Sequence, residues 1–305
     1  MAAARGAPLH PRAMRIARDL DTLRAAAAEL RAGGRTLAFV PTMGALHAGH
    51  LALVAAARRL APATAASIFV NPLQFGAHED LDRYPRDEAG DLDALRAAGC
   101  DLVWLPTPAV MYPPGSATTV EVGGPAEGWE GAARPGHFRG VATVCAKLFS
   151  QTGADLAVFG QKDWQQLQVV RRVVRDLALP VRIVGVPTVR EPDGLALSSR
   201  SRFLSPPERA LAPRLHAEMW RAAEAVAAGA PAAATVAGAA QELGRAGFGV
   251  DYFAVVEAET MRPLEAWPAP GGGPARLVAA ARLGTVRLLD NLPVPLGPAA
   301  RRTLP

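Results

Sequence analysis

His47 and His50 are the residues of this sequence whose types and spacing most directly suggest chemistry. They lie three positions apart, so both imidazoles can occupy one side of a helix entrance. The apolar run at 36–40 predicts a buried parallel strand that stops at Pro41, and a helical period begins at Gly49. A strand that turns into a helix presents unpaired backbone N–H groups, which bind phosphate well. The pattern therefore predicts a polyphosphate site.

A shared zinc ion is the alternative chemistry for two neighbouring histidines. Zinc sites take three or four Cys, His or carboxylate ligands at recognisable spacings. No third ligand follows His50 at such an interval. We therefore expect no metal ion to be bound directly by side chains at this turn.

Side-chain amides are predicted at the same edge of the sheet as the histidines. Asn71 and Gln74 follow the strand predicted at 64–70, and Gln166 lies one turn inside a later helix. Amides at the ends of parallel strands can orient a small polar molecule, although Asn71 also suits a turn cap. Gln74 and Gln166 are therefore candidates for binding a polar substrate.

Lys162 is one of two lysines among 33 basic residues, the other being Lys147. Because arginine supplies positive charge elsewhere, a remaining lysine suggests a place where the compact ammonium is needed. Lys162 follows Gly160 at the end of a strand, where we predict that it faces a phosphate. Asp163 is expected to cap the helix at 164–177. Lys147 lies within a helix and is expected on its surface.

A third polar loop, Ser198-Ser199-Arg200, follows the strand predicted at 181–186 and a glycine-containing turn. Two hydroxyls and a guanidinium can donate several hydrogen bonds to phosphate oxygens. Such a tripeptide is common by chance. Its position after a third strand of the same framework favours phosphate binding.

A framework of parallel strands and helices must bring these loops together, and the pattern predicts an α/β fold with a Rossmann-like, doubly wound parallel sheet. The predicted strands are 36–40, 64–70, 101–105, 155–159 and 181–186, with a short edge strand at 118–122. The predicted helical regions are 16–31, 49–60, 80–98, a segment carrying Thr143 and Lys147, and 164–177. The Gly- and Pro-rich stretch 123–136 is predicted to be a flap that closes the site.

A smaller C-terminal α+β domain is predicted from the change in character after 190. It would contain helices at 208–228 and 233–246 and strands at 250–256, 275–281 and 285–289. We expect a disordered extension at 1–13, with Met14 as an alternative start, a nucleotide-binding domain at 14–190, a lid domain at 191–295 and a tail at 296–305.

Composition excludes several classes of protein. The chain has 305 residues, half of them hydrophobic and a fifth charged, with no apolar run long enough to span a bilayer and no secretory h-region. Cys100 and Cys145 lie in apolar surroundings and are expected to be buried thiols in the cytoplasm. The net charge of +5 owes much to arginines in the two tails, so nucleic-acid binding is disfavoured.

Five stretches carry a resemblance to a known family. They are PTMGALHAGH at 41–50, FVNPLQF at 69–75, GHFRGV at 136–141, FGQKDWQQ at 159–166 and DGLALSSR at 193–200. In this order they resemble the pantoate–β-alanine ligase (pantothenate synthetase) family of the nucleotidylyltransferase superfamily, over about 14–294 of the chain. The resemblance implies ATP-dependent joining of pantoate to β-alanine through a pantoyl adenylate, with release of AMP and pyrophosphate.

The resemblance also implies roles for particular residues. Those contacting the nucleotide would be Met43, Gly44, Ala45, Leu46, His47, Ala48, Gly49, His50, Gly160, Gln161, Lys162, Asp163, Val189, Leu197, Ser198, Ser199 and Arg200. Those assigned to catalysis would be His50, His47, Lys162, Ser198 and Arg200, with His50 as proton donor. Gln74 and Gln166 would bind pantoate, and Gln74 would also lie near β-alanine. Mg²⁺ would ride on the ATP phosphates, and the protein would be a homodimer.

Such a reaction needs fixed cationic donors around the phosphorus, which we expect His50, Lys162, Ser198 and Arg200 to supply. The sequence departs from the family pattern at Gln161, where Glu is expected, and at Trp164, where Tyr or Phe is expected. It departs again at 201–203, where Ser-Arg-Phe replaces Asn-x-Tyr, and this change bears on how Ser199 and Arg200 are placed.

Three other functions stay open at this point. A nucleotidylyltransferase that keeps an adenylylated product would share the histidine turn but would not need Gln74 and Gln166. A non-catalytic nucleotide-binding protein would be expected to lack His50 or Lys162, and both are present. RNA binding through the arginine-rich tails would be steeply salt-dependent.

Overall fold

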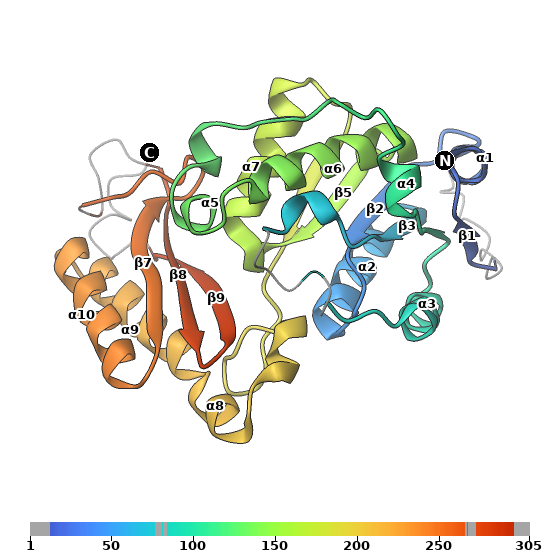
Figure 1. Cartoon of the computed structure of the whole chain (residues 1–305). Helices are drawn as coiled ribbons and strands as arrows, with labels where there is room; N and C mark the ends of the chain where they lie inside the picture. The colour runs from blue at the N-terminus through green and yellow to red at the C-terminus, as the bar shows by residue number, and fades with distance from the viewer. Residues whose placement is uncertain (1–12, 77–80, 82–83, 266, 268–272, 296–305) are drawn as a thin grey trace, which may run out of the picture.

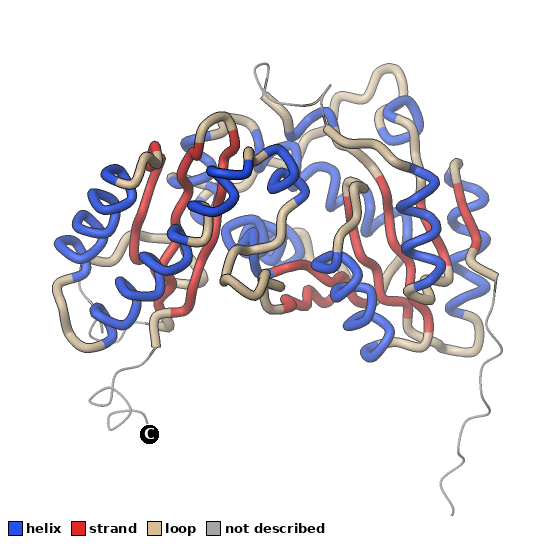
Figure 2. The backbone as a smooth tube through the Cα atoms, turned by 90° about the horizontal axis from the view of Figure 1, so that it is seen from below, coloured by secondary structure: helices blue, strands red, loops and turns tan. Residues whose placement is uncertain are grey.

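The computed structural model describes residues 13–76, 81, 84–265, 267 and 273–295. Its two units lie side by side (Figures 1 and 2). The first contains a six-stranded parallel sheet with helices, and the second a three-stranded antiparallel sheet with helices. The predicted fold class, a Rossmann-like doubly wound sheet followed by a smaller α+β unit, is confirmed.

All strands of the first sheet run parallel. In sheet order they are β1 (Arg15–Ala17), β4 (Leu102–Trp104), β3 (Ala63–Ile68), β2 (Leu37–Thr42), β5 (Leu156–Gly160) and β6 (Arg182–Val186). The chain moves outward from β2 through β3 to β4 and then returns to start β5 on the other side of β2. In open α/β sheets, ligands bind outside the carboxyl ends of the strands at such a switch point. Here that point lies between β2 and β5.

Helices cover both faces of this sheet. The helices are α1 (Leu20–Arg31), α2 (Ala48–Leu60), α3 (Glu88–Ala97), α4 (Pro108–Met111), α5 (Trp129–Ala133), α6 (His137–Thr152) and α7 (Trp164–Asp176). Short 3₁₀ turns are η1 (Pro72–Gln74), η2 (Gly124–Ala126), η3 (Gln161–Asp163) and η4 (Ser199–Phe203). Most of these turns lie between a strand and the next helix.

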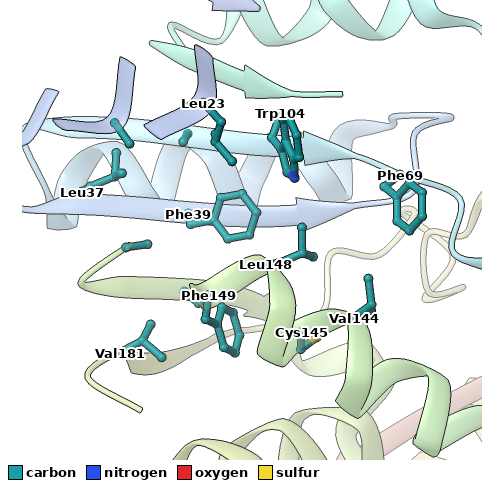
Figure 3. Packing of buried hydrophobic residues seen from close by; sticks show 14 of the residues in the cluster. Leu23, Leu37, Phe39, Phe69, Trp104, Val144, Cys145, Leu148, Phe149 and Val181 are labelled. Carbon is teal, nitrogen blue, oxygen red and sulfur yellow. The ribbon is translucent and has the colours of Figure 1, made fainter. Parts of the chain in front are cut away.

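Successive residues of β2 point to opposite faces of the sheet and belong to different cores. Leu37 and Phe39 pack in the layer formed by α1, α6 and α7, and Figure 3 shows Phe39 there with Trp104 and Leu148. Ala38 and Val40 pack against α2 and α3 on the other face. A strand apolar on both sides is what a doubly covered parallel sheet requires.

The C-terminal unit has its own buried core, which includes residues between Leu195 and Val294. Its sheet is formed by β7 (Gly249–Glu257), β8 (Ala275–Leu283) and β9 (Val286–Pro293) in that order. Its helices are α8 (Pro206–Leu211), α9 (Arg214–Ala227) and α10 (Ala232–Arg245), of which α9 and α10 pack on the sheet (Figure 2). The boundaries at 190 and 295 and the lid role stay predictions.

The N-terminal helix begins later than predicted. Residues 15–17 form β1, which pairs with β4, so the expected helix at 16–31 is wrong over its first turn. Asp19 is the reason, because its side chain accepts a hydrogen bond from the Thr22 N–H at 2.8 Å and starts the helix there.

Strand β2 continues through Pro41, where the sequence predicted its end. Thr42 faces β3, since its carbonyl accepts from the Phe69 N–H at 3.0 Å, so Pro41 faces the β5 side. The pairing of β5 with β2 is confined to Ala38 and Phe39. The missing N–H of Pro41 therefore costs the sheet no hydrogen bond.

Three other predicted elements differ from the structure. Residues 118–122 form no strand, because the Val120 N–H donates to Thr143 Oγ1 at 2.9 Å rather than to a sheet edge. The helix expected at 80–98 is α3, which begins after its cap Asp87, while residues 80, 82 and 83 lie outside the described part. The single helix expected at 208–228 is broken into α8 and α9 at Pro213.

The segment 123–136, predicted to be an irregular flap, contains η2 and α5. The expected extension at 1–13, apart from residue 13, and the tail at 296–305 lie outside the described residues. Within the described part of the chain, no helix is both long and apolar enough to cross a membrane.

Candidate active site

A cavity of about 980 Å³ lies at the carboxyl ends of β2, β3 and β5. That volume suits one or two small-molecule ligands. The predicted site residues that line it are Met43, His47, Gly49, His50, Gln74, Gly160, Lys162, Asp163, Gln166, Val189, Leu197, Ser198, Ser199 and Arg200. The predicted residues that do not line it are Gly44, Ala45, Leu46, Ala48 and Gln161. The loops that follow β2, β3, β5 and β6 thus meet at one place.

The turn after β2 is held from behind by Asp91 of α3. One carboxylate oxygen accepts from the Ala45 N–H and the other from the Leu46 N–H, both at 2.8 Å. Asp91 is buried, and a Cβ on Gly44, whose φ is +81°, would come within 2.7 Å of its Oδ2. Gly44, Ala45 and Leu46 therefore form the back of the turn, and their N–H groups are already in use. Sequence analysis missed Asp91 because it belongs to a charged helix distant in the chain.

The two imidazoles lie together at the start of α2, with ring centroids 4.2 Å apart. His47 Nδ1 accepts from the Gly49 N–H at 3.1 Å, and His50 Nδ1 accepts from the His47 N–H at 3.3 Å. Because each Nδ1 is an acceptor, the neutral form of each ring carries its hydrogen on Nε2. The turn therefore offers two Nε2–H donors.

Both imidazoles are neutral at physiological pH. Burial, with a smaller contribution from the neighbouring His47, lowers the pKa of His50 to about 3. Burial also lowers the pKa of His47, with Lys162 the next largest cause. With its pKa lowered in this way, His50 is a neutral hydrogen-bond donor at pH 7, and not the fixed cation that the sequence analysis expected.

Lys162 lies on η3, directly after β5. Its Nζ is 3.6 Å from Asp163 Oδ1, and its side chain is 20% exposed. Asp163 occupies the position that precedes α7, but its side chain makes no capping hydrogen bond, contrary to prediction. The 3₁₀ turn at 161–163 directs the carboxylate toward the lysine instead. A cation and a carboxylate thus stand next to each other on the cavity wall.

The loop that follows β6 closes onto the histidine turn. Ser199 Oγ donates to the Ala45 carbonyl at 3.2 Å. Ser198 caps η4, and its Oγ accepts from the Arg200 N–H at 3.3 Å. Despite the departure at 201–203, Ser199 and Arg200 line the cavity. Two loops separated by about 150 residues are therefore joined directly at the site.

Gln74 is held in one orientation by a chain of hydrogen bonds. Tyr112 Oη donates to Asn71 Oδ1 at 2.8 Å, and Asn71 Nδ2 donates to Gln74 Oε1 at 3.0 Å. Gln74 Nε2 then lies 3.1 Å from Met43 Sδ, at the histidine turn. Asn71 Nδ2 also donates to the Gly140 carbonyl at 3.1 Å, where a Cβ on Gly140 would meet the Leu73 carbonyl oxygen at 2.2 Å. This close approach seats α6 against η1.

The two glutamines at the start of α7 have different tasks. Gln166 lines the cavity. Gln165 is buried, and its Nε2 donates to the carbonyls of Pro125, Glu127 and Gly128 at 3.0–3.3 Å. Its Oε1 accepts from the Glu130 N–H at 3.0 Å. Gln165 thereby ties the predicted flap to the sheet unit, and closure of that segment stays a prediction.

The C-terminal unit supplies polar residues that sequence analysis did not assign to the site. Arg287 Nη1 is 2.7 Å from both carboxylate oxygens of Glu130, and Arg287 Nε donates to Asp251 at 2.6 Å. Asp290 and Asn291 of β9 also line the cavity and are buried. The signal for these two was an adjacent Asp-Asn pair in a strand that is otherwise apolar apart from Arg287, since such a pair is costly to bury without partners.

Cys145 also lines the cavity, but burial raises the pKa of its thiol to about 12, so it remains a protonated, apolar wall group. Both cysteines are buried and free, as predicted. Among the residues that the structure describes, no group of three or more His, Cys, Asp or Glu side chains is arranged to hold a metal ion.

Comparison with known proteins gives similarity across both units. The family model for pantoate-beta-alanine ligase matches residues 15–293. A pantothenate synthetase of Acidiphilium cryptum (strain JF-5) is 57% identical over 282 residues, covering 92% of this chain and 100% of that protein. One from Granulibacter bethesdensis (strain ATCC BAA-1260 / CGDNIH1) is 56% identical over 279 residues, covering 92% and 96%.

Solved structures show the same arrangement. The pantothenate synthetase from Thermus thermophilus superposes with a TM-score of 0.84 at 51% identity, covering 92% of this chain and 99% of that one. A pantoate-beta-alanine ligase from Francisella tularensis, solved with beta-gamma ATP and beta-alanine, has a TM-score of 0.76 at 29% identity, covering 92% and 98%. The family model's match, over residues 15–293, includes every loop that lines the cavity.

Proposed function

Because this chain belongs to the pantoate–β-alanine ligase family, we propose that it joins pantoate to β-alanine at the expense of ATP, giving pantothenate, AMP and pyrophosphate. One observation carries the proposal at the level of the site. The histidine turn, the Lys162 turn and the Ser198–Arg200 loop all line one cavity at the switch point between β2 and β5. The Francisella ligase was solved with beta-gamma ATP and β-alanine, which supports the same substrates here.

In the first step, a carboxylate oxygen of pantoate attacks the α-phosphorus of ATP, the bond from the α-phosphorus to the α,β-bridging oxygen breaks, and pyrophosphate leaves. Negative charge spreads over the phosphoryl oxygens as this happens. We assign Lys162 and Arg200 as the cationic groups, Ser198 as a hydroxyl donor, and His47 and His50 as neutral Nε2–H donors. Their value lies in being fixed before the reaction, so no reorganisation is needed.

Pantoate is proposed to lie against Gln74 and Gln166. Gln74 Oε1 is already occupied by Asn71, so its Nε2 is the group directed toward the histidine turn. In the second step the amine of β-alanine attacks the acyl carbon of pantoyl adenylate, the C–N bond forms, and the C–O bond to AMP breaks. Neither step requires a covalent bond to the enzyme.

Mg²⁺ is proposed to arrive on the ATP phosphates, where it would neutralise part of their charge. Asp163 is the carboxylate that would face it, because it lines the cavity beside Lys162. Mg²⁺ sites of this kind use one or two carboxylates together with substrate phosphates, and this donor set fits that pattern.

Location and assembly belong to the same proposal. Two buried free thiols fit a reducing compartment such as the cytoplasm. A homodimer is proposed from the family resemblance alone. Light scattering of the purified protein would measure the mass in solution, and a monomer at micromolar concentration would exclude it.

The test is a product assay with purified protein, ATP and Mg²⁺. We expect AMP only when pantoate and β-alanine are both present. A stable adenylylated product with no AMP would instead indicate a nucleotidylyltransferase.

Replacing His50 or Lys162 tests the site assignment. We expect His50→Ala and Lys162→Ala each to lower kcat by about 10²–10³-fold, because each removes a fixed donor to the phosphoryl oxygens. The matched control is Lys147→Ala, which we expect to leave kcat nearly unchanged. Lys147 belongs to α6, its Nζ lies 5.7 Å from the centre of the Tyr112 ring, and it does not line the cavity. Rates like those of the unmodified protein in both site variants would contradict the assignment.

A further inference from the structure

Asn291 of β9 reaches across to the turn that carries Lys162. Its Nδ2 donates to the Gln161 carbonyl at 2.9 Å and to the Lys162 carbonyl at 2.7 Å. Asn291 is 3% exposed, so water does not compete for these hydrogen bonds. The backbone of a loop in the parallel-sheet unit is therefore held by a side chain of the other unit.

The orientation of the Asn291 amide is itself fixed. Its Oδ1 accepts from Arg276 Nε at 2.5 Å, and the Arg276 guanidinium lies 3.6 Å from the centre of the Trp164 ring. Trp164 begins α7, directly after η3, and its Nε1 donates to the Ala258 carbonyl at 2.7 Å. Because one amide oxygen is taken by Arg276, the Nδ2 hydrogens can only point toward the Lys162 turn.

Asp290, the preceding residue, holds the second loop. It accepts from Arg190 Nη1 at 2.5 Å and Nη2 at 2.9 Å, and Arg190 also donates to the Gly194 carbonyl at 3.0 Å. These contacts fix a small hairpin in which the Leu197 N–H donates to the Val189 carbonyl at 3.0 Å. The hairpin leads directly into Ser198–Arg200.

We propose that Asp290 and Asn291 are positioning residues that set the separation between Lys162 and the Ser198–Arg200 loop. The inference rests on the proposed function of those two loops in holding ATP. Asp290 and Asn291 are neighbouring buried residues of β9, and their side chains bind one loop each. A paired strand is stiff, so it can fix the distance between two loops that must contact the same triphosphate. Displacement of such groups by about 1 Å is enough to cost about 10²-fold in rate.

A double-mutant cycle tests the part played by Asn291. We expect Asn291→Ala to lower kcat/KM for ATP by about 10–100-fold and to weaken binding of a non-hydrolysable ATP analogue, with KM for β-alanine unchanged. If Asn291 acts through Lys162, then Asn291→Ala should cost less than about 3-fold when it is made in Lys162→Ala. If the two losses multiply, Asn291 does not position Lys162 and the proposal is wrong.

Asn291→Asp is a second variant that tests whether the effect of Asn291→Ala comes only from a loss of folding. It keeps the volume and the acceptor for Arg276 but offers no donor to the two carbonyls, so we expect the same coupling with Lys162→Ala. The control is Glu257→Gln, since Glu257 ends β7 in the same sheet and its side chain contacts Thr260 and Arg262 of its own unit. Loss of kcat/KM equal to that of Asn291→Ala in this control would show that the unit, and not Asn291, matters.

The same double-mutant cycle with Asp290→Asn and Arg200→Ala tests the Ser198–Arg200 loop. If the two losses of kcat/KM multiply, Asp290 does not position this loop and that part of the proposal is wrong. Failure of the proposed function is distinguishable, because the unmodified protein would then make no AMP from pantoate and β-alanine. Coupling in analogue binding would still decide whether these residues position the two loops.

Discussion

The two walls of the cavity are held in place in different ways. The histidine turn is fixed within the parallel-sheet unit, by the Asp91 carboxylate on two amides and by the Nδ1 atoms of its own histidines. The Lys162 turn is fixed by a side chain of the C-terminal unit, Asn291. One wall is therefore held by packing within a single unit, whereas the other depends on how the two units meet.

The difference matters for the order in which the site is assembled. A wall held by its own unit is complete once that unit has folded. A wall held by the neighbouring unit is complete only when both units are in contact. The neutral histidine donors lie on the first wall and Lys162 lies on the second. The placement of the Lys162 ammonium therefore depends on contact between the two units.

The largest effect on stability is expected where the first wall is broken. Asp91→Ala leaves the buried N–H group of Ala45 and the half-buried N–H group of Leu46 without an acceptor, so we expect about 2–4 kcal/mol less free energy of unfolding in a denaturant titration. We also expect a higher KM for ATP, because the turn no longer has one conformation.

The matched control for Asp91 lies on the same helix. Glu88 makes an exposed ion pair with Arg18, and Glu88→Gln should change the free energy of unfolding by less than about 0.5–1 kcal/mol. Equal stability of the Asp91 and Glu88 variants would show that the first wall is not held locally.

A pH titration sharpens the picture of the first wall. The pKa of His50 is about 3 in the folded protein and near 6.5 when unfolded, so the unfolded chain binds more protons between these values. The free energy of unfolding should therefore fall as the pH drops from 7 to 5. His50→Asn does not titrate, so it should lose about 1–2 kcal/mol less over this range. A parallel decline in both proteins would mean that His50 is charged in the folded state.

The smallest effect is expected at the contact between the units. Trp164→Phe removes the donor to the Ala258 carbonyl and part of the surface under Arg276, so we expect about 1 kcal/mol less stability. Because Asn291 keeps its other contacts, kcat should fall by less than about 10-fold.

Trp220 provides the comparison for this substitution. It is 53% exposed on α9 and stacks on His216, so Trp220→Phe should leave both stability and kcat nearly unchanged. If the two variants behave alike, Trp164 does not help to hold the second wall.

The sequence predicted those parts of the molecule that depend on local patterns. Apolar runs followed by glycine or polar residues marked β2, β3, β5 and β6, and the ends of parallel strands necessarily lie on one edge. The same reasoning brought His50, Lys162 and Arg200 to one cavity. Family resemblance added the substrates.

What the sequence could not predict depends on contacts between distant segments. Asp91 looked like one charge among many on a helix, because the residues around it in the sequence do not indicate that two backbone N–H groups of another loop donate to its carboxylate. Asn291 lies 130 positions from Gln161. β1 was hidden because three residues at a sheet edge carry no period of their own. The protonation of His50 depends on burial, which only the folded structure reveals.

Gly140 extends this lesson to a residue with no functional group. The Leu73 carbonyl oxygen occupies the space where any side chain at 140 would begin. The backbone of η1 and the amide of Gln74 are seated against that bare surface, so a single methyl group there would displace both. A residue that touches no substrate and carries no charge can thus be as irreplaceable in such a ligase as one that meets ATP, and a comparison of sequences alone would give no chemical reason for it.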